Sequence, residues 1–180
     1  HVGELVVKHI GLPEDVERFA GPGDVSAIVK LRSPEAHKGD FGRLLIIGGS
    51  ETYSGAPTLT ALAALRTGID LAFVAAPRET AYAISAMSPD LITVKLEGDH
   101  LNSGCLPIVK QQLEKATAVA IGPGIGLHKD TREAVKAIIK LVESKKIPML
   151  LDADGLKAFA EFRHRLKSPA VLTPHLGEYQ

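Results

Sequence analysis

Residues whose types could do chemistry follow several short apolar runs of this 180-residue sequence. Gly48-Gly49-Ser50 comes directly after the first run, and a small-residue turn, Ser54-Gly55-Ala56-Pro57, comes just behind it. Three further groups follow later runs: Gly122-Pro123-Gly124-Ile125-Gly126, Asp152 with Asp154, and Thr173-Pro174-His175-Leu176-Gly177-Glu178. Glycine lets a ligand approach the backbone closely, and carboxylates or imidazoles can contact a ligand or a metal. The pattern indicates a ligand site lined partly by backbone.

The polar members of these groups also have structural interpretations, which the residues alone leave open. Asp154 could be the N-cap of a following helix, whereas Asp152 at a strand end needs a ligand, a metal shell or a loop amide. His175 could make a structural hydrogen bond or orient a substrate. Glu178 could bind a metal or simply stabilise the first turn of a helix.

Common nucleotide-binding motifs fit poorly. The segment beginning at Gly122 has two glycines of the dinucleotide fingerprint but Leu127 where the third should be, and "GGSETYSGAP" lacks the Gly-Lys ending of a Walker loop. Cys105 has no neighbouring partner and is expected to be buried packing. The pair His37-Lys38 is expected to be solvated, and the remaining histidines show no motif.

The elements that must position these residues alternate between strand and helix. Six apolar runs are expected to be strands: Leu44–Ile47, Leu71–Ala75, Leu91–Leu96, Ala118–Ile121, Pro148–Leu151 and Ala170–Leu172. The clearest helix is predicted over Asp130–Lys146, with Asp130 as N-cap and Glu133 completing a capping box. Repeated strand–helix–strand units predict an α/β fold with a mainly parallel sheet and helices on both faces. In such sheets ligands bind beyond the carboxyl ends of the strands, where the groups above gather.

Composition excludes some classes of function. Lys+Arg and Asp+Glu both number 21, so the formal net charge is zero and there is no basic footprint for nucleic acid. No apolar run approaches the ~18 residues that a membrane-spanning helix needs. One cysteine allows no disulfide within the chain and favours a reducing compartment, so we expect a cytoplasmic protein. Residues 1–32 differ from the rest and are interpreted as a leader and linker before the α/β unit.

The ordered motifs resemble one family, the ADP/ATP-dependent NAD(P)H-hydrate dehydratases of the ribokinase-like superfamily. They are "HKGDFGRLLIIGGSETYSGAP", "AALRTGIDLAFVAAP", "AIGPGIG", "LDADGLKAF" and "LTPHLGE". The resemblance covers residues 33–180, interpreted as the N-terminal part of the dehydratase domain. The leader "GELVVKHIGLP" looks like the end of an NAD(P)H-hydrate epimerase domain, which precedes the dehydratase in bifunctional relatives.

The resemblance implies an activity and its partners. The family phosphorylates the ring hydroxyl of hydrated NADH or NADPH with ADP or ATP, and phosphate then leaves. Mg²⁺ is expected with the nucleotide. The resemblance also implies that the protein forms a homo-oligomer. It further implies that the remainder of the same polypeptide completes the active site.

The resemblance implies roles for particular residues. Substrate contacts carry over to Ala56, Gly124, Gly126 and His175. Glu178 matches an acidic residue used around the metal, and the remaining cleft candidates are Gly49, Asp152 and Asp154. The family's catalytic Asp and its adenine-nucleotide loop are expected beyond Gln180, so this chain alone is not expected to turn over substrate.

Two other functions stay open from the residues alone. One is a ribokinase-like kinase for a sugar or a vitamin alcohol. The other is a non-catalytic module that binds pyridine nucleotides.

Overall fold

The computed structural model describes residues 11, 13, 19–29, 31–162 and 164–179, and the chain divides into two units, His1–Ala36 and His37–Gln180. In the first unit, helix α2 (Pro22–Ile28) begins with a proline, and the Asp24 carboxylate accepts a hydrogen bond from the Gly21 amide at 2.7 Å. The sequence predicts only leader and linker here, because a short capped turn without buried residues leaves no apolar pattern. None of the α2 residues is buried. The short apolar piece at residues 5–7 would suit a strand, but it lies outside the described residues.

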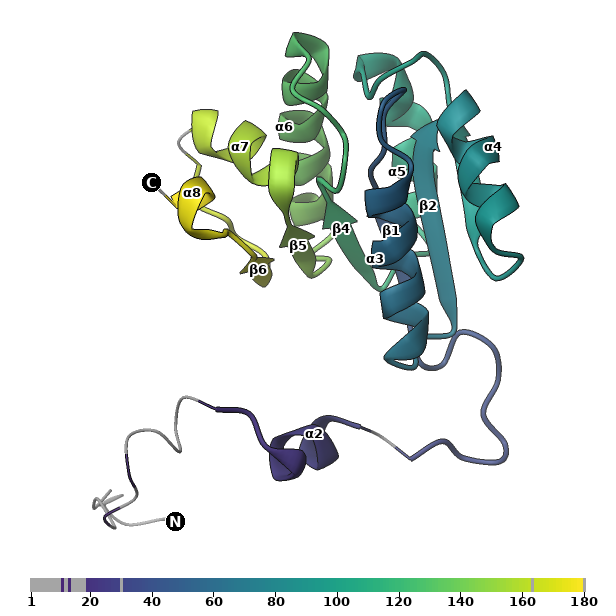
Figure 1. Cartoon of the computed structure of the whole chain (residues 1–180), viewed down its shortest axis with the longest axis vertical. Coiled ribbons are helices and arrows are strands. Elements are labelled where there is room, and N and C mark those ends of the chain that lie inside the picture. The colour runs from purple at the N-terminus through teal and green to yellow at the C-terminus, as the bar shows by residue number, and fades with distance from the viewer. Residues whose placement is uncertain (1–10, 12, 14–18, 30, 163, 180) are drawn as a thin grey trace. The chain divides into compact units, whose positions relative to one another are not determined.

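The second unit contains a six-stranded parallel sheet with the strand order β3-β2-β1-β4-β5-β6 (Figure 1). The strands are β1 (Arg43–Ile47), β2 (Leu71–Pro77), β3 (Ile92–Leu96), β4 (Ala118–Ile121), β5 (Met149–Leu151) and β6 (Ala170–Leu172). All five pairings are parallel. The six predicted strands are therefore confirmed, with differences only at their ends.

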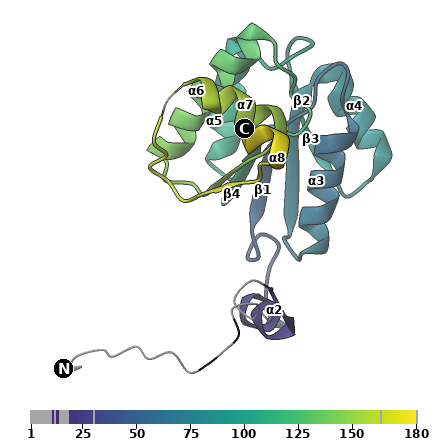
Figure 2. The same cartoon turned by 60° about the vertical axis from the view of Figure 1, so that its left-hand side comes forward.

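Helices cover both faces of this sheet. They are α3 (Gly55–Arg66), α4 (Arg78–Met87), α5 (Leu106–Leu113), α6 (Lys129–Ser144), α7 (Ala153–Glu161) and α8 (Leu176–Tyr179), with a short 3-10 turn η1 (Ser103–Cys105) before α5. In Figure 2, α3 and α4 lie on one side of the strands, and α5, α6 and α7 lie on the other. The predicted α/β class with both faces covered is confirmed.

Successive side chains of β1 point to opposite faces of the sheet, so the strand contributes to two hydrophobic cores. Leu45 and Ile47 point into the core shared with α5, α6 and α7, whereas Ile46 points into the core shared with α3 and α4. All three side chains are at most 1% exposed. A strand buried on both faces must be apolar at every position, which is why the run Leu44–Ile47 lacks polar residues. Cys105 is also buried in the first core, and burial raises the pKa of its thiol.

Helix α6 starts slightly earlier than predicted. Its N-cap is His128, whose Nδ1 accepts a hydrogen bond from the Asp130 amide at 3.3 Å. The predicted cap at Asp130 is wrong, because Asp130 already lies in the first turn, where its charge suits the helix dipole. The helix has one apolar face: Ala134, Val135, Ile138, Ile139 and Val142 are buried, and Leu141 is partly buried.

The strand order reverses between β1 and β4, because the chain builds outward to β3 on one side and to β6 on the other. In a doubly wound sheet, the loops that leave the two strands at such a switch point diverge and open a crevice. The loops after β1 and β4 are therefore the natural place to look for a ligand. No helix among the described residues combines the length and hydropathy needed to cross a membrane.

Candidate functional site at the carboxyl edge of the sheet

The loops after β1 and β4 contact each other through the backbone. The Gly49 amide donates to the Pro123 carbonyl at 2.8 Å, and the Gly122 amide donates to the Ile47 carbonyl at 3.0 Å. These bonds fix the two glycine-rich segments side by side at the switch point. Two motifs that are far apart in the sequence therefore form one surface.

Packing and backbone conformation explain why position 49 is a glycine. Its φ of +84° lies in the left-handed region, and a Cβ there would stand 3.0 Å from the Thr80 side chain and 3.2 Å from the Tyr53 carbonyl. The Thr80 hydroxyl also donates to the Ser50 carbonyl at 2.7 Å. The described residues thus account for this glycine without a ligand, and its predicted contact with substrate stays a prediction.

Ala56 and Gly124 are brought close together. A Cβ built on Gly124 would lie 3.5 Å from Cδ of Pro57, the residue that follows Ala56, and 2.9 Å from Cβ of Tyr53. Ala56 is exposed in the first turn of α3, whose opening amides have no partner within the helix. Among the described residues, neither the Ala56 amide nor the Gly124 amide donates a hydrogen bond. The switch point therefore presents two backbone donors that have no partner among the described residues.

Gly126 lies at the open side of this loop. Its φ is +75°, and a Cβ there would meet no atom within 4 Å. Its amide donates to the Asp154 carboxylate at 3.2 Å, and the other oxygen of Asp154 accepts from Lys157 Nζ at 2.9 Å. Gly126 thus leaves room next to the backbone while its own amide is already used.

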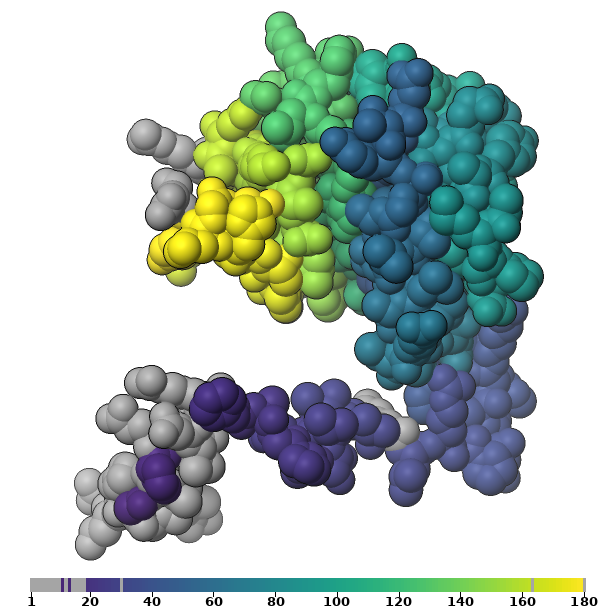
Figure 3. Space-filling view, in the orientation of Figure 1, coloured from purple at the N-terminus to yellow at the C-terminus, as the bar shows by residue number. Residues whose placement is uncertain are grey.

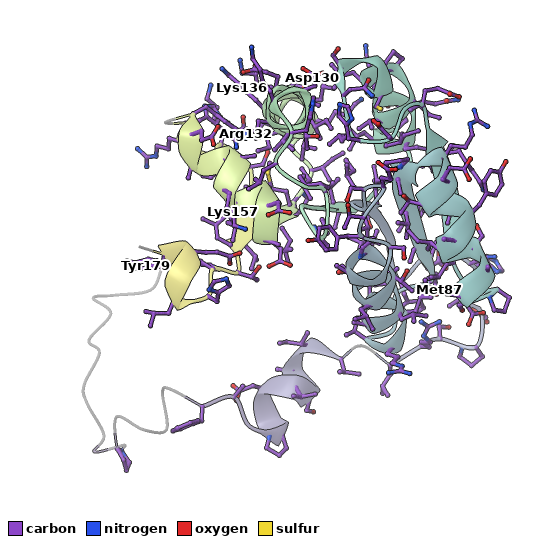
Figure 4. All side chains as sticks on the ribbon, turned by 45° about the horizontal axis from the view of Figure 1, so that its top comes forward. Met87, Asp130, Arg132, Lys136, Lys157 and Tyr179 are labelled. Atoms are coloured by element: carbon purple, nitrogen blue, oxygen red, sulfur yellow. The ribbon has the colours of Figure 1, made fainter. Side chains whose placement is uncertain are left out.

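Asp154 ties α7 to the glycine loop. The expected N-cap role is wrong, because Asp152 holds the N-cap position and Asp154 lies in the first turn of α7. Lys157 projects from the same helix (Figure 4). The hydrogen bond and the charge of Asp154 raise the pKa of Lys157, and Glu178 and Tyr53 raise it further. The Lys157 ammonium group therefore interacts electrostatically with both Glu178 and Tyr53 at this edge of the sheet.

The Asp152 carboxylate accepts a hydrogen bond from a residue at the end of a neighbouring strand. Its Oδ1 accepts from the Thr173 hydroxyl at 2.7 Å, just after β6. The Asp152 amide in turn donates to the Ile121 carbonyl at 3.1 Å. The partner of this carboxylate is therefore a threonine hydroxyl, which is none of the three expected partners (a ligand, a metal shell or a loop amide).

His175 and Glu178 form a local pair at the start of α8. Glu178 Oε2 accepts from the His175 amide at 3.2 Å, and Glu178 Oε1 lies 3.4 Å from His175 Nε2. His175 Nδ1 accepts from the Gly177 amide at 3.0 Å, so the proton of a neutral ring sits on Nε2. The His175 side chain is 72% exposed, whereas that of Glu178 is 7% exposed. Figure 3 shows the segment that carries them, coloured yellow, at the edge of the α/β unit.

Glu178 does not fit a Mg²⁺ site by itself. Both of its oxygens face His175, and no group of three metal-ligating side chains that includes Glu178 occurs in the described part of the chain. Mg²⁺ usually takes one or two carboxylates together with substrate phosphates. The observed geometry favours the helix-turn interpretation of Glu178, and its metal role stays a prediction.

Two side chains at this edge, Tyr53 and Lys157, were not predicted as contributors, and the contact of Thr173 with Asp152 was not predicted either. Tyr53 packs against both glycine loops, Lys157 pairs with Asp154, and Thr173 binds Asp152. The quoted motifs contain all three, but nothing in their spacing marks the contact. A pocket of about 300 Å³ adjoins this edge at the ends of β2 and β3, and its lining includes Glu51, Arg78 and Asp99.

Comparison with known proteins identifies the family. The sequence model of the family described as NAD(P)H-hydrate dehydratase matches residues 44–180. The chain belongs to the NAD(P)H-hydrate dehydratase family. The match spans β1 to α8, so it includes every residue of the sheet edge described above.

Individual relatives agree with membership of the NAD(P)H-hydrate dehydratase family. The chain is 45% identical over 180 residues to a bifunctional NAD(P)H-hydrate repair enzyme from Pyrobaculum aerophilum, covering all of this chain and 35% of that protein. It is also similar to the ADP/ATP-dependent NAD(P)H-hydrate dehydratase from Bacillus subtilis co-crystallised with ATP/Mg²⁺, with 28% identity and a TM-score of 0.68, covering 87% of this chain and 52% of that one. The chain thus spans about a third of the length of the curated relative.

The structure is also similar to a solved protein of lower sequence identity. A ribokinase-like superfamily protein from Enterococcus faecalis shares 22% identity with a TM-score of 0.76, covering 98% of this chain and 58% of that one. At this identity the likeness concerns the fold. The predicted ribokinase-like fold is confirmed.

Proposed function

We propose that the natural polypeptide carrying this sequence dehydrates hydrated NADH and NADPH at the expense of ADP or ATP, as a metabolite-repair enzyme. The observation that carries the proposal is the pair of free amides, at Ala56 and Gly124, at the switch point of a chain in the dehydratase family. Backbone amides at a helix start and a glycine loop suit the oxygen-rich surface of a dinucleotide.

The proposed chemistry has two steps. The ring hydroxyl oxygen attacks the terminal phosphorus of the nucleotide, and the bond from that phosphorus to the leaving ADP (or AMP, from ADP) breaks. The ring C–O bond then breaks, phosphate departs with its electron pair, and a neighbouring ring carbon loses a proton as the double bond forms. Hydroxide is a poor leaving group, so phosphorylation makes the elimination feasible. Positioning and charge stabilisation dominate such transfers.

The residues of this chain would bind and orient the substrate. We assign the substrate contacts to Ala56, Gly124 and Gly126 on one side and to His175 on the other. The exposed imidazole of His175 can donate from Nε2, and its orientation is held by the Gly177 amide and Glu178. The proton acceptor and most of the nucleotide site are proposed to come from residues outside this chain.

The same proposal includes the domain organisation, the oligomeric state and the location of the protein. We interpret residues 1–32 as the end of an NAD(P)H-hydrate epimerase domain and a linker, in line with the bifunctional relative. A homo-oligomer and a cytoplasmic location complete the proposal. The single buried cysteine, Cys105, suits a reducing compartment.

The alternatives differ in their products. A kinase acting on a sugar or a vitamin alcohol would accumulate a stable phosphorylated product, whereas a dehydratase releases free phosphate. A binding module would do neither. The test is to incubate the natural polypeptide with hydrated NADPH, ATP and Mg²⁺ and to measure phosphate.

We expect one phosphate for each molecule of NADPH that is regenerated. A stable phosphorylated adduct, or saturable binding without any phosphate, would replace the proposal with the corresponding alternative.

A further inference from the structure

Two histidines that showed no motif in the sequence meet at the start of α6. The ring centroids of His100 and His128 lie 4.0 Å apart, with an angle of 41° between the planes. His100 follows β3 in the chain, and His128 is the N-cap of α6. Asp130 projects from the first turn of α6 (Figure 4). Its Oδ2 lies 3.7 Å from His100 Nε2 and 3.8 Å from His128 Nδ1.

One nitrogen of this group is buried and lacks a hydrogen bond. His100 Nε2 is inaccessible to solvent and has no hydrogen-bond partner among the described residues. On the other side of the ring, His100 Nδ1 is hydrogen-bonded to the Asp99 carboxylate. A carboxylate accepts only, so Nδ1 carries the proton and the Nε2 lone pair of the neutral ring points toward Asp130. Two lone-pair acceptors that face each other without a proton repel, and a cation between them would relieve this.

The arrangement matches what transition metals need. A metal-bound histidine usually donates its other ring N–H to a carboxylate, which fixes the tautomer and the ring orientation, and Asp99 is placed to do this for His100. The three ligand atoms lie within 4.8 Å of one another. A tetrahedral Zn²⁺ with bonds of about 2.0–2.1 Å holds its ligand atoms roughly 3.3–3.4 Å apart, so these side chains would draw together on binding.

The group is also held in place by the core. Thr131, next to Asp130 and fully buried, donates its hydroxyl to the Leu101 carbonyl at 2.9 Å. This bond joins the start of α6 to the loop that carries His100. The ligands therefore come from two segments whose spacing is already fixed by a buried contact.

We propose that His100, His128 and Asp130 bind a transition-metal ion such as Zn²⁺, with water completing the coordination. At His128 the metal would replace the hydrogen bond that Nδ1 accepts from the Asp130 amide. Imidazole ligands favour Zn²⁺, Ni²⁺ or Co²⁺ over Mg²⁺, so this site is separate from any Mg²⁺ that accompanies a nucleotide. The bound ion links the loop after β3 to the start of α6. It stabilises that side of the sheet edge.

The test is calorimetric titration of the untagged, EDTA-treated protein with ZnCl₂. We expect one saturable Zn²⁺ per chain near neutral pH and no competition from Mg²⁺. The variants His100→Gln and His128→Asn should each weaken binding by more than the ~10- to 100-fold expected for Asp99→Asn, which removes only the outer carboxylate. His37→Ala, which removes an exposed histidine elsewhere, should bind like wild type.

Two results would overturn the proposal. One is unchanged Zn²⁺ affinity in both His100→Gln and His128→Asn, in variants that melt like wild type in EDTA. The other needs no variant: crystals of the wild-type protein soaked in Zn²⁺ should show an anomalous peak between His100 Nε2 and Asp130. Its absence there at saturating Zn²⁺, or a peak only at another place, would exclude the site.

Discussion

At the scale of single residues, His175 offers the most direct test of a role in substrate binding. Its side chain is largely exposed, so replacing it removes few packing contacts. We expect His175→Ala to lower the activity of the natural polypeptide by roughly 10²-fold or more, because an orienting or proton-donating group is lost. The free energy of unfolding should hardly change. Equal losses of activity and thermal stability would instead identify His175 as a structural residue.

Ala56 tests the close approach of substrate to the switch point. Ala56→Leu keeps a good helix former in the first turn of α3 but fills the space above the two free amides. We expect substrate affinity to fall by more than about tenfold, since steric overlap costs on the order of 1–3 kcal/mol, with an unchanged melting temperature.

The matched control for this change is Ala63→Leu, an exposed position further along the same helix. It should leave substrate affinity unchanged. If both variants bound substrate like wild type, the substrate would not contact the start of α3.

At the scale of single elements, the end of α6 carries a local strain that can be relieved. The amides of Lys146 and Ile147 donate to the carbonyls of Glu143 and Val142, which is the Schellman pattern. Lys146 takes the left-handed position of this motif with a φ of +55°, where glycine is usual. We expect Lys146→Gly to raise the free energy of unfolding by about 0.5–1 kcal/mol, measured by thermal or urea denaturation.

Lys146→Ala is the control for charge, because it removes the ammonium group but keeps the Cβ. It should not be stabilising. A gain of the same size in both variants would mean that charge, and not backbone strain, is responsible.

Glu143 should make stability depend on pH. Burial raises the pKa of this carboxyl, but hydrogen bonds from the Lys167 amide at 2.6 Å and from the His164 ring at 2.8 Å lower it more, so the net pKa is below 4.5. A folded-state pKa below the unfolded value stabilises the fold above the unfolded pKa. The contribution is lost as the pH falls through the folded pKa.

The measurement compares Glu143→Gln with wild type in urea denaturation from neutral pH to about pH 3. Wild type should be the more stable protein above about pH 4.5, with the difference shrinking below it. Glu133→Gln removes the same charge from an exposed position on the same helix and should have little effect. A pH-independent difference between Glu143→Gln and wild type would contradict this account.

The positions of strands and helices could be predicted from the sequence where hydrophobic periodicity alone determines them. The strands and the apolar face of α6 repeat with clear periods, so their positions follow from burial. The cap of α6 was not predictable in the same way, because His128 and Asp130 can both serve as caps and only the local backbone decides. Helix α2 was missed because a short turn without buried residues leaves no apolar pattern.

At the scale of the whole molecule, topology decides which motifs meet. The sequence predicts that the strand-end groups share one edge, but the order of strands places the loops of β1 and β4 side by side. The hydrogen bonds that Gly126 donates to Asp154 and that Thr173 donates to Asp152 cross between strands, so no local spacing reveals them. The same is true of His100 and His128, which lie on opposite sides of β4 in the sequence.

The central claim is that this sheet edge serves the repair of hydrated nicotinamide dinucleotides. The most direct measurement adds hydrated NADH, ADP and Mg²⁺ to the natural polypeptide and follows the near-ultraviolet absorbance of the reduced nicotinamide ring. The account predicts that absorbance returns only when the nucleotide is present, and that Ala56→Leu slows its return whereas Ala63→Leu does not. No return of absorbance under conditions in which a known dehydratase is active would contradict it.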